Sequence, residues 1–182
     1  MSELFVKVCG ITTTEQLEWA IDLGYDAVGL MRAAKSVRLM EPDRARELVE
    51  HAAGRIDTFA VGLTLADVEP IIDVVDTVQL YEYADVPSLA LASDTPPEST
   101  KGLEYWFYDA SHGTGTFAEI PAWVTSVEAD FVLAGGLNPD NVAEVVARFR
   151  PAGVDVSSGV ESSSGVKDYD RMKAFIEAAR GA

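Results

Sequence analysis

The sequence predicts an α/β fold in which eight parallel strands close into a single (β/α)8 barrel, one domain over residues 1–182. Short apolar runs alternate with helix-like segments along the whole chain, which is the pattern of a parallel sheet with crossover helices. Eight such runs can be counted, and eight favours a closed barrel over an open, doubly wound sheet. The composition shows no break or linker that would separate a second core.

The predicted elements follow from apolar spacing and from residues typical of helix ends. The strands cover residues 5–9, 27–30, 58–63, 77–80, 89–92, 105–109, 131–134 and 153–156. Thr12 and Glu15 have capping-box spacing, so a helix is expected to start there and to end at Gly24. Pro42 suits the first position of a second helix, and apolar residues recur at helical spacing in residues 138–149. A last helix shows the same spacing at Met172, Phe175, Ile176 and Ala179.

The segment around the fifth strand is too short for full helices. Residues 82–103 must hold a strand and both of its connections, and residues 94–99 contain two adjacent prolines, which disfavour helix continuation. We therefore expect the helices flanking the fifth strand to be shortened or missing. This also explains a chain shorter than the roughly 250 residues typical of the fold.

Charge and cysteine content exclude several classes of function. The net charge is −16, from 30 acidic and 14 basic residues, which argues against nucleic-acid and anionic-membrane partners. No apolar run approaches the roughly 20 residues needed to cross a bilayer, and the N-terminus lacks the basic start of a signal peptide, so a cytoplasmic protein is expected. One cysteine and two distant histidines, His51 and His112, support neither a metal site nor a redox role.

The first strand carries a candidate for base chemistry. Period-two alternation puts Phe5, Lys7 and Cys9 on one face of residues 5–9, and Cys9 ends the strand where catalytic groups of parallel α/β folds usually lie. An alternative is that Cys9 is a small buried hydrophobe, as free cysteines often are.

Two glycine-bearing turns are candidates for binding a phosphate. Gly135 and Gly136 follow one predicted strand, and Ser158 and Gly159 follow the next. Glycine lets a phosphate approach backbone N–H groups, serine adds a hydroxyl, and barrels frequently bind phosphate after strands seven and eight. Turn geometry alone is the alternative for each. Residues 162–165 are either the start of another short helix or a loop.

Asp109 is a candidate acid at the end of an aromatic strand. In an apolar pocket its carboxyl group would be suited to general acid catalysis, whereas a turn cap is the alternative. The glycine-rich loop that follows contains Gly113 and Gly115, and its His112 is interpreted as a loop residue.

Together these residues resemble the phosphoribosylanthranilate isomerase family over most of the chain. The resemblance rests on KVCGIT at 7–12, KSVR at 35–38, QL at 79–80, Asp109 with GTG at 113–115, LAGGLN at 133–138, GVDVSSGVE at 153–161 and GVKD at 165–168.

The resemblance implies a (β/α)8 barrel that performs a cofactor-free Amadori rearrangement of N-(5'-phosphoribosyl)anthranilate in tryptophan biosynthesis. By matching positions, Asp109 is the general acid, Cys9 the general base, and Arg38 holds the anthranilate carboxylate, although from residue type alone a surface ion pair is the alternative for Arg38. Gly113, Gly115, Gly135, Gly136, Ser158 and Gly159 would then contact the substrate, a small phosphosugar.

Lys7 is expected to pair with Asp155, since the first and eighth strands become neighbours when a barrel closes. As a hypothesis, the charge of Lys7 favours the Cys9 thiolate. Lys7 and Asp155 are both expected to be substrate-binding residues. We expect a monomer or weak homodimer.

One departure from the family pattern lies at the fourth strand, where Tyr81 and Glu82 replace a frequent histidine and glycine. Two other functions stay open. A histidine-pathway ribonucleotide isomerase would share the phosphate site but should have aspartate in place of Cys9. A non-catalytic phosphosugar-binding barrel would keep the phosphate site without turnover.

Overall fold

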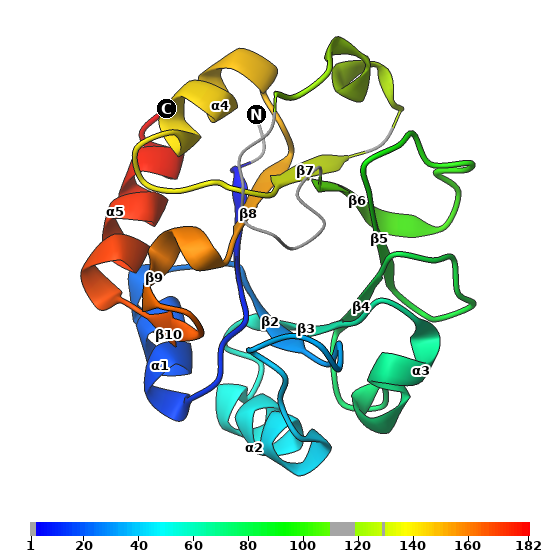
Figure 1. Cartoon of the computed structure of the whole chain (residues 1–182), viewed down its shortest axis with the longest axis vertical. Helices are drawn as coiled ribbons and strands as arrows, with labels where there is room; N and C mark the ends of the chain where they lie inside the picture. Colours follow the sequence, from blue (N-terminus) through cyan, green and yellow to red (C-terminus); the bar gives the residue numbers. More distant parts are fainter. Residues whose placement is uncertain (1–2, 110–118, 129) are drawn as a thin grey trace.

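Eight parallel strands form a closed barrel in the computed structural model, which describes residues 3–109, 119–128 and 130–182. Each strand pairs with the next in sequence, and β8 pairs with β1 to close the ring (Figure 1). The predicted fold is confirmed. Each strand begins and ends within two residues of its predicted position. The strands are β1 (Phe5–Cys9), β2 (Ala27–Met31), β3 (Asp57–Val61), β4 (Thr77–Leu80), β5 (Leu89–Ser93), β6 (Leu103–Asp109), β7 (Phe131–Ala134) and β8 (Gly153–Val156).

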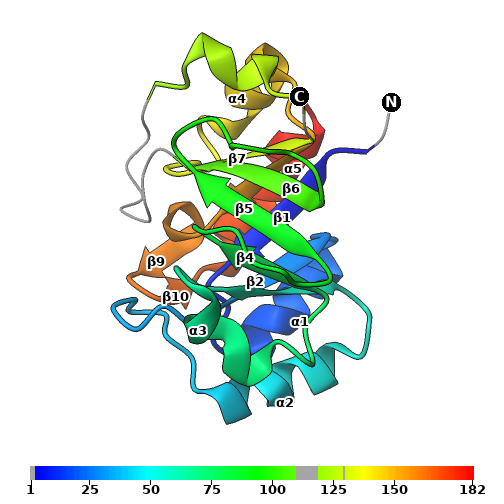
Figure 2. The same cartoon turned by 90° about the vertical axis from the view of Figure 1, so that its right-hand side faces the viewer.

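Helices lie outside the ring and cover it unevenly. The α-helices among the described residues are α1 (Thr14–Leu23), α2 (Pro42–Ala52), the one-turn α3 (Leu65–Val68), α4 (Val142–Phe149) and α5 (Tyr169–Arg180). No helix occurs in residues 81–88 or 94–102, the two connections on either side of β5. Figure 2 shows β5 and β6 facing the viewer with no helix in front of them. The expected loss of helices around the fifth strand is therefore confirmed.

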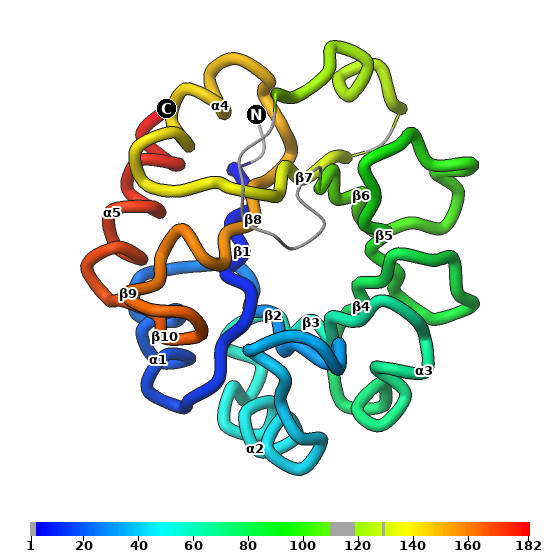
Figure 3. Tube along the Cα trace, in the orientation of Figure 1, coloured from blue at the N-terminus to red at the C-terminus, as the bar shows by residue number. Residues whose placement is uncertain are grey.

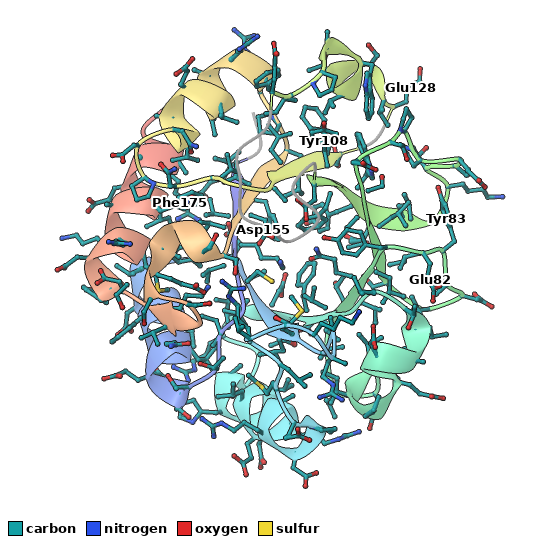
Figure 4. The ribbon with its side chains drawn as sticks, in the orientation of Figure 1. Glu82, Tyr83, Tyr108, Glu128, Asp155 and Phe175 are labelled. Carbon is teal, nitrogen blue, oxygen red and sulfur yellow. The ribbon has the colours of Figure 1, made fainter. Side chains whose placement is uncertain are left out.

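The connections that lack helices brace each other instead. The hydroxyl of Tyr83, before β5, donates to the carbonyl of Ser99 at 2.7 Å, and the N–H of Ser99 donates back to the same hydroxyl at 2.9 Å. In Figure 4 Tyr83 lies at the outer edge of the molecule, away from the ring centre. These contacts therefore stabilise the wall from its outer side.

Alternation along β1 separates two apolar layers. Val6 and Val8 belong to the large core between strands and helices, whereas Cys9 belongs to a smaller cluster inside the barrel, against which Phe5 packs. Phe5 stacks on Tyr105 of β6 with 4.8 Å between ring centroids. Both aromatic residues lie toward the strand N-termini, so they fill that end of the interior and leave the C-terminal end for a site.

Local hydrogen bonds shift two of the predicted helix starts. Thr13, not Thr12, caps α1 by accepting from the N–H of Gln16, while the N–H and hydroxyl of Thr12 donate to the Gln16 side chain at 2.9 and 3.2 Å. Gly24 ends α1 in a left-handed conformation (φ 81°), as predicted. The expected helix at 138–149 begins only at Val142, because Asn138 and Asn141 bond each other's backbone in a turn.

The segment after β8 forms a hairpin, which corrects the alternative of a helix start at 162–165. Strands β9 (Glu161–Ser163) and β10 (Val166–Lys167) pair antiparallel, and Gly165 turns between them with φ 81°. The tube in Figure 3 passes from β8 through this hairpin and then into α5. The hairpin brings Glu161 and Lys167 to the barrel mouth.

Candidate active site

A cavity of about 700 Å³ opens at the C-terminal ends of the strands. Its wall is made by residues at or just after the ends of the barrel strands, as in other (β/α)8 folds. Figure 4 shows one of them, Asp155 of β8, inside the ring of strands. The lining includes Cys9, Val61, Gln79, Tyr81, Asp109, Gly135, Gly136, Asp155, Ser158 and, from the loop after β2, Arg38.

Cys9 reaches the cavity because its neighbour on β2 has no side chain. Cys9 pairs in register with Gly29, and a Cβ built on Gly29 would lie 2.7 Å from the Cys9 sulfur. A larger residue on β2 would displace the thiol. Gly29 is therefore a determinant of the site that sequence patterns did not single out.

Lys7 and Asp155 form a buried ion pair beneath the cavity. The two residues are partners in the β1–β8 register, and Lys7 Nζ donates to Asp155 Oδ1 at 2.8 Å, as predicted from barrel closure. The ammonium group also lies 5.5 and 5.2 Å from the ring centres of Phe59 and Phe107. Burial is the largest single influence on Lys7 and lowers its pKa, but the charges and hydrogen bonds of Asp155 and Cys9 together outweigh burial, so the pKa is raised and Lys7 stays cationic.

The electrostatic effect of Lys7 on the Cys9 thiol is opposed by burial. Burial is the largest influence on the thiol and raises its pKa, while the charge of Lys7 opposes burial and that of Asp155 reinforces it. The net result is a raised pKa, because the thiolate loses more hydration than one nearby cation restores. The charge of Lys7 thus favours the thiolate, as hypothesised, but it does not compensate for the burial of the thiol.

Asp109 is held by a tyrosine from another strand end. Asp109 ends β6 and is buried, and the Tyr81 hydroxyl donates to its Oδ2 atom at 2.6 Å. Tyr81 directly follows β4 and lines the cavity itself. Burial raises the pKa of Tyr81 above its usual range, so the hydroxyl keeps its proton and acts as a donor. The sequence marked Tyr81 only as a departure from the family pattern.

Arg38 is fixed by a cluster that joins two loops. Its Nε and Nη2 atoms donate to the two carboxylate oxygens of Glu161, each at 2.7 Å, and Lys167 Nζ donates to Glu161 Oε1 at 2.8 Å. Burial would raise the pKa of Glu161, but hydrogen bonds and charge from Arg38 and Lys167 hold it at about 2. Gly10 gives the arginine its space, since a Cβ there would lie 2.3 Å from Arg38 Cδ. The orientation of Arg38 is thus fixed by Glu161, while the residue still lines the cavity.

The two predicted phosphate turns pack directly against each other. Gly135 and Gly136 have φ values of 89° and 72°, which favour glycine, and both line the cavity together with Ser158. Gly159 lies behind them, where a Cβ would come within 1.9 Å of the Leu137 carbonyl oxygen. Glycine at 159 is therefore required for the turns after β7 and β8 to meet.

The structure brings most of the predicted site residues together at one place. Those that line the cavity are Cys9, Arg38, Asp109, Gly135, Gly136, Asp155 and Ser158. Lys7 and Gly159 support the lining from behind it. Gly113 and Gly115, together with His112, lie outside the described residues.

Two further features bear on the excluded classes. Within residues 3–109, 119–128 and 130–182, the side chains of His, Cys, Asp and Glu nowhere gather in the threes that would hold a metal ion. Over the same residues, the helices are too short or too polar to cross a membrane.

Comparison with known proteins places the chain in a family. The sequence model described as N-(5'phosphoribosyl)anthranilate (PRA) isomerase matches residues 105–178. The N-(5'-phosphoribosyl)anthranilate isomerase of Paramagnetospirillum magneticum is 36% identical, over 97% of each chain. The crystal structure of TrpF from Jonesia denitrificans superposes with a TM-score of 0.84 at 33% identity, covering 98% of this chain and 97% of that one.

A second solved structure is informative because of its bound molecule. It is a phosphoribosyl anthranilate isomerase in complex with reduced 1-(o-carboxyphenylamino)-1-deoxyribulose 5-phosphate, with a TM-score of 0.78 at 26% identity, covering 98% of this chain and 100% of that chain. Sequence and fold agree over nearly the full length of these proteins. The chain therefore belongs to the N-(5'-phosphoribosyl)anthranilate isomerase family of tryptophan biosynthesis.

Proposed function

We propose that this chain isomerises N-(5'-phosphoribosyl)anthranilate to 1-(2-carboxyphenylamino)-1-deoxyribulose 5-phosphate with Cys9 as general base and Asp109 as general acid. The observation that carries the assignment is that both side chains face one cavity, from the ends of β1 and β6. The turns after β7 and β8 form another part of the same wall. An acid, a base and a phosphate cradle are the groups that this rearrangement needs.

The proposed steps balance without a cofactor. The protonated carboxyl of Asp109 gives its proton to the furanose ring oxygen, the bond from that oxygen to C1 breaks, and the nitrogen lone pair forms a Schiff base. Cys9, as the thiolate, then removes the proton from C2, and an enolamine results. The C2 hydroxyl of the enolamine loses a proton while C1 gains one, which gives the ketone product with no net change in protons. General acids and bases of this kind each contribute about 10²- to 10⁴-fold.

The raised pKa of Cys9 sets a condition on the base. At neutral pH the thiolate is a minor form, because burial outweighs the favourable charge of Lys7. A thiolate that has lost its hydration is a stronger base once formed, and Lys7 is the cation that lies beneath it. We assign Lys7 and Asp155 to the support of this base rather than to recognition of the sugar.

Arg38 and the glycine turns account for the two charged ends of the substrate. Glu161 occupies the Nε and Nη2 edge of Arg38, which leaves the Nη1 side of the guanidinium for the anthranilate carboxylate. The phosphate is assigned to the turns of Gly135, Gly136 and Ser158. The similar solved structure that holds a reduced deoxyribulose 5-phosphate supports a ligand of this class.

The test follows the loss of N-(5'-phosphoribosyl)anthranilate fluorescence, with the substrate generated in situ. We expect Cys9→Ala and Asp109→Asn to lower kcat/KM at least about 100-fold, as the loss of a general base or acid predicts. Asp170→Asn, the same change at an exposed residue of α5, is the matched control and should leave the rate unchanged. Turnover by both site variants near the wild-type rate contradicts the assignment. Binding without turnover by the folded wild type favours a non-catalytic phosphosugar-binding barrel.

A further inference from the structure

The hydrogen bond between Tyr81 and Asp109 connects strand ends that are not neighbours in the sheet. Tyr81 follows β4 and Asp109 ends β6, so β5 lies between them in the ring. The residues of β5 that belong to the interior cluster are Ala90 and Ala92, and Tyr81 packs against this cluster. Small side chains at these positions leave the tyrosine ring room to reach across the strand.

The backbone on either side of the Tyr81 ring is held in place. The N–H of Tyr81 donates to the Leu63 carbonyl at 3.3 Å. The next residue, Glu82, accepts from the N–H of Leu65 at 2.8 Å and thereby caps the first turn of α3. Tyr81 and Glu82, which replace the histidine and glycine frequent in the family, thus act as a pair: one residue anchors the segment and the other reaches Asp109.

We propose that Tyr81 is a positioning residue for Asp109, which fixes the carboxyl so that Oδ1 delivers the proton to the substrate. This inference rests on the proposed role of Asp109 as general acid. Because Oδ2 accepts from the Tyr81 hydroxyl at 2.6 Å, Oδ1 is the oxygen that would carry the proton in the acid form of the carboxyl. Tyr81 thereby distinguishes the two carboxyl oxygens, and Oδ1 is the one that we assign to the sugar ring oxygen.

Tyr81 also acts at the moment of proton transfer. When Oδ1 loses its proton, the carboxyl becomes a carboxylate and the hydrogen bond to Oδ2 becomes charge-assisted, which makes it stronger. An interaction that strengthens as the reaction proceeds lowers the barrier, whereas one of constant strength affects binding only. A phenol serves this purpose across the physiological pH range, because it stays a neutral donor where an imidazole would titrate.

The first experiment removes only the hydroxyl. We expect Tyr81→Phe to lower kcat about 10- to 100-fold, the value of a hydrogen bond to a charged group, while KM changes less than about 2-fold. The matched control is Tyr25→Phe, since the Tyr25 hydroxyl is also buried and donates to the Met172 carbonyl at 2.8 Å, far from the cavity. It should lower the melting temperature without changing kcat. Unchanged kcat in Tyr81→Phe, or a change in KM alone, overturns the proposal.

A double-mutant cycle shows whether Tyr81 acts through Asp109. In an Asp109→Asn background, Tyr81→Phe should change the residual rate less than about 2-fold, because the group that it positions no longer donates a proton. A full 10-fold loss in that background means that Tyr81 acts independently and contradicts the proposal. The two hypotheses fail differently: an active Asp109→Asn refutes the general acid, whereas an inactive Asp109→Asn beside an active Tyr81→Phe refutes only the role of Tyr81.

Discussion

The carbonyl oxygen of Leu137 passes 1.9 Å from the point where a Cβ on Gly159 would stand. The turn after β7 and the turn after β8 therefore meet backbone to backbone, with no side chain between them. Gly135 and Gly136 of the first turn and Ser158 of the second line the cavity. The spacing of the groups that we assign to the phosphate thus depends on the absence of a side chain at position 159.

Replacing Gly159 with alanine should separate the two turns. We expect a KM increase of at least about 10-fold and a stability loss of about 1–3 kcal/mol, the usual cost of inserting a methyl group into a packed region. Gly54→Ala is the control, since Gly54 has a positive φ (71°) but nothing within 4 Å of the added Cβ. It should strain the chain without changing KM. Steady-state kinetics and thermal unfolding measure both effects, and equal KM values in the two variants would refute the steric argument.

The raised pKa of Cys9 predicts slow alkylation near neutral pH. Cys9 is the only cysteine, so its reaction with iodoacetamide can be followed by mass without interference. We expect the rate in the folded protein to rise continuously past pH 9, whereas the urea-unfolded chain should level off above the ordinary thiol pKa of about 8.5. In Lys7→Met the folded thiol should react even more slowly, because the cation that lowers its pKa is gone. A plateau below pH 8 in the folded wild type would contradict the burial argument.

The Lys7–Asp155 pair predicts strongly coupled effects on stability. Lys7→Met should cost about 3–5 kcal/mol in the free energy of unfolding, because it leaves Asp155 buried without its partner. The double variant Lys7→Met/Asp155→Leu should recover most of that loss. As a control, Lys173→Met at the exposed i,i+4 pair with Glu177 should change stability little. Urea titrations of Lys7→Met, Asp155→Leu and the double variant measure these free energies of unfolding. A stability loss in the double variant equal to the sum of the two single losses would contradict the prediction.

The Glu161 cluster predicts a stability that depends on acid pH. The pKa of Glu161 is about 2 in the folded protein and 4.5 in its ordinary state, so the cluster stabilises the fold fully above pH 4.5. The difference in unfolding free energy between wild type and Glu161→Gln should therefore be largest near pH 6, at no more than about 3 kcal/mol from ionisation. It should shrink as the pH falls from 4.5 toward 2. Glu144→Gln, at an exposed position of α4, is the control, and a difference independent of pH would be the contrary result.

Local spacing was enough to predict the fold and much of the site, because both follow the strands. Alternation along β1 places Lys7 and Cys9 inside the barrel, and closure makes β8 the neighbour of β1, which brings Asp155 to Lys7. Asp109 could be predicted as a candidate site residue from its position at the end of β6 alone. The start of α1 was wrong by one residue, because Gln16 competes for Thr12.

The contacts that could not be predicted from the sequence join side chains from segments that lie far apart in the chain. Glu161 lies 123 residues from Arg38, and only the β9–β10 hairpin brings the two groups together. Tyr81 contacts Asp109 across an intervening strand, which no periodicity encodes. Arg32 likewise donates to the carbonyls of Met40 and Asp67, two contacts that no local spacing predicts.

The closed ring of strands has a consequence for the order of the chain. Arg180 Nη1 of α5 lies 3.6 Å from Glu3 Oε1, so side chains from the two ends of the described chain meet. The connection between β5 and β6 carries no residue of the cavity lining and no helix. A circular permutant that joins the old ends and opens at residues 94–102 would thus retain every neighbour in the barrel. In a closed ring, every strand has two neighbours whichever strand comes first in the chain, so the position of the termini does not determine the barrel.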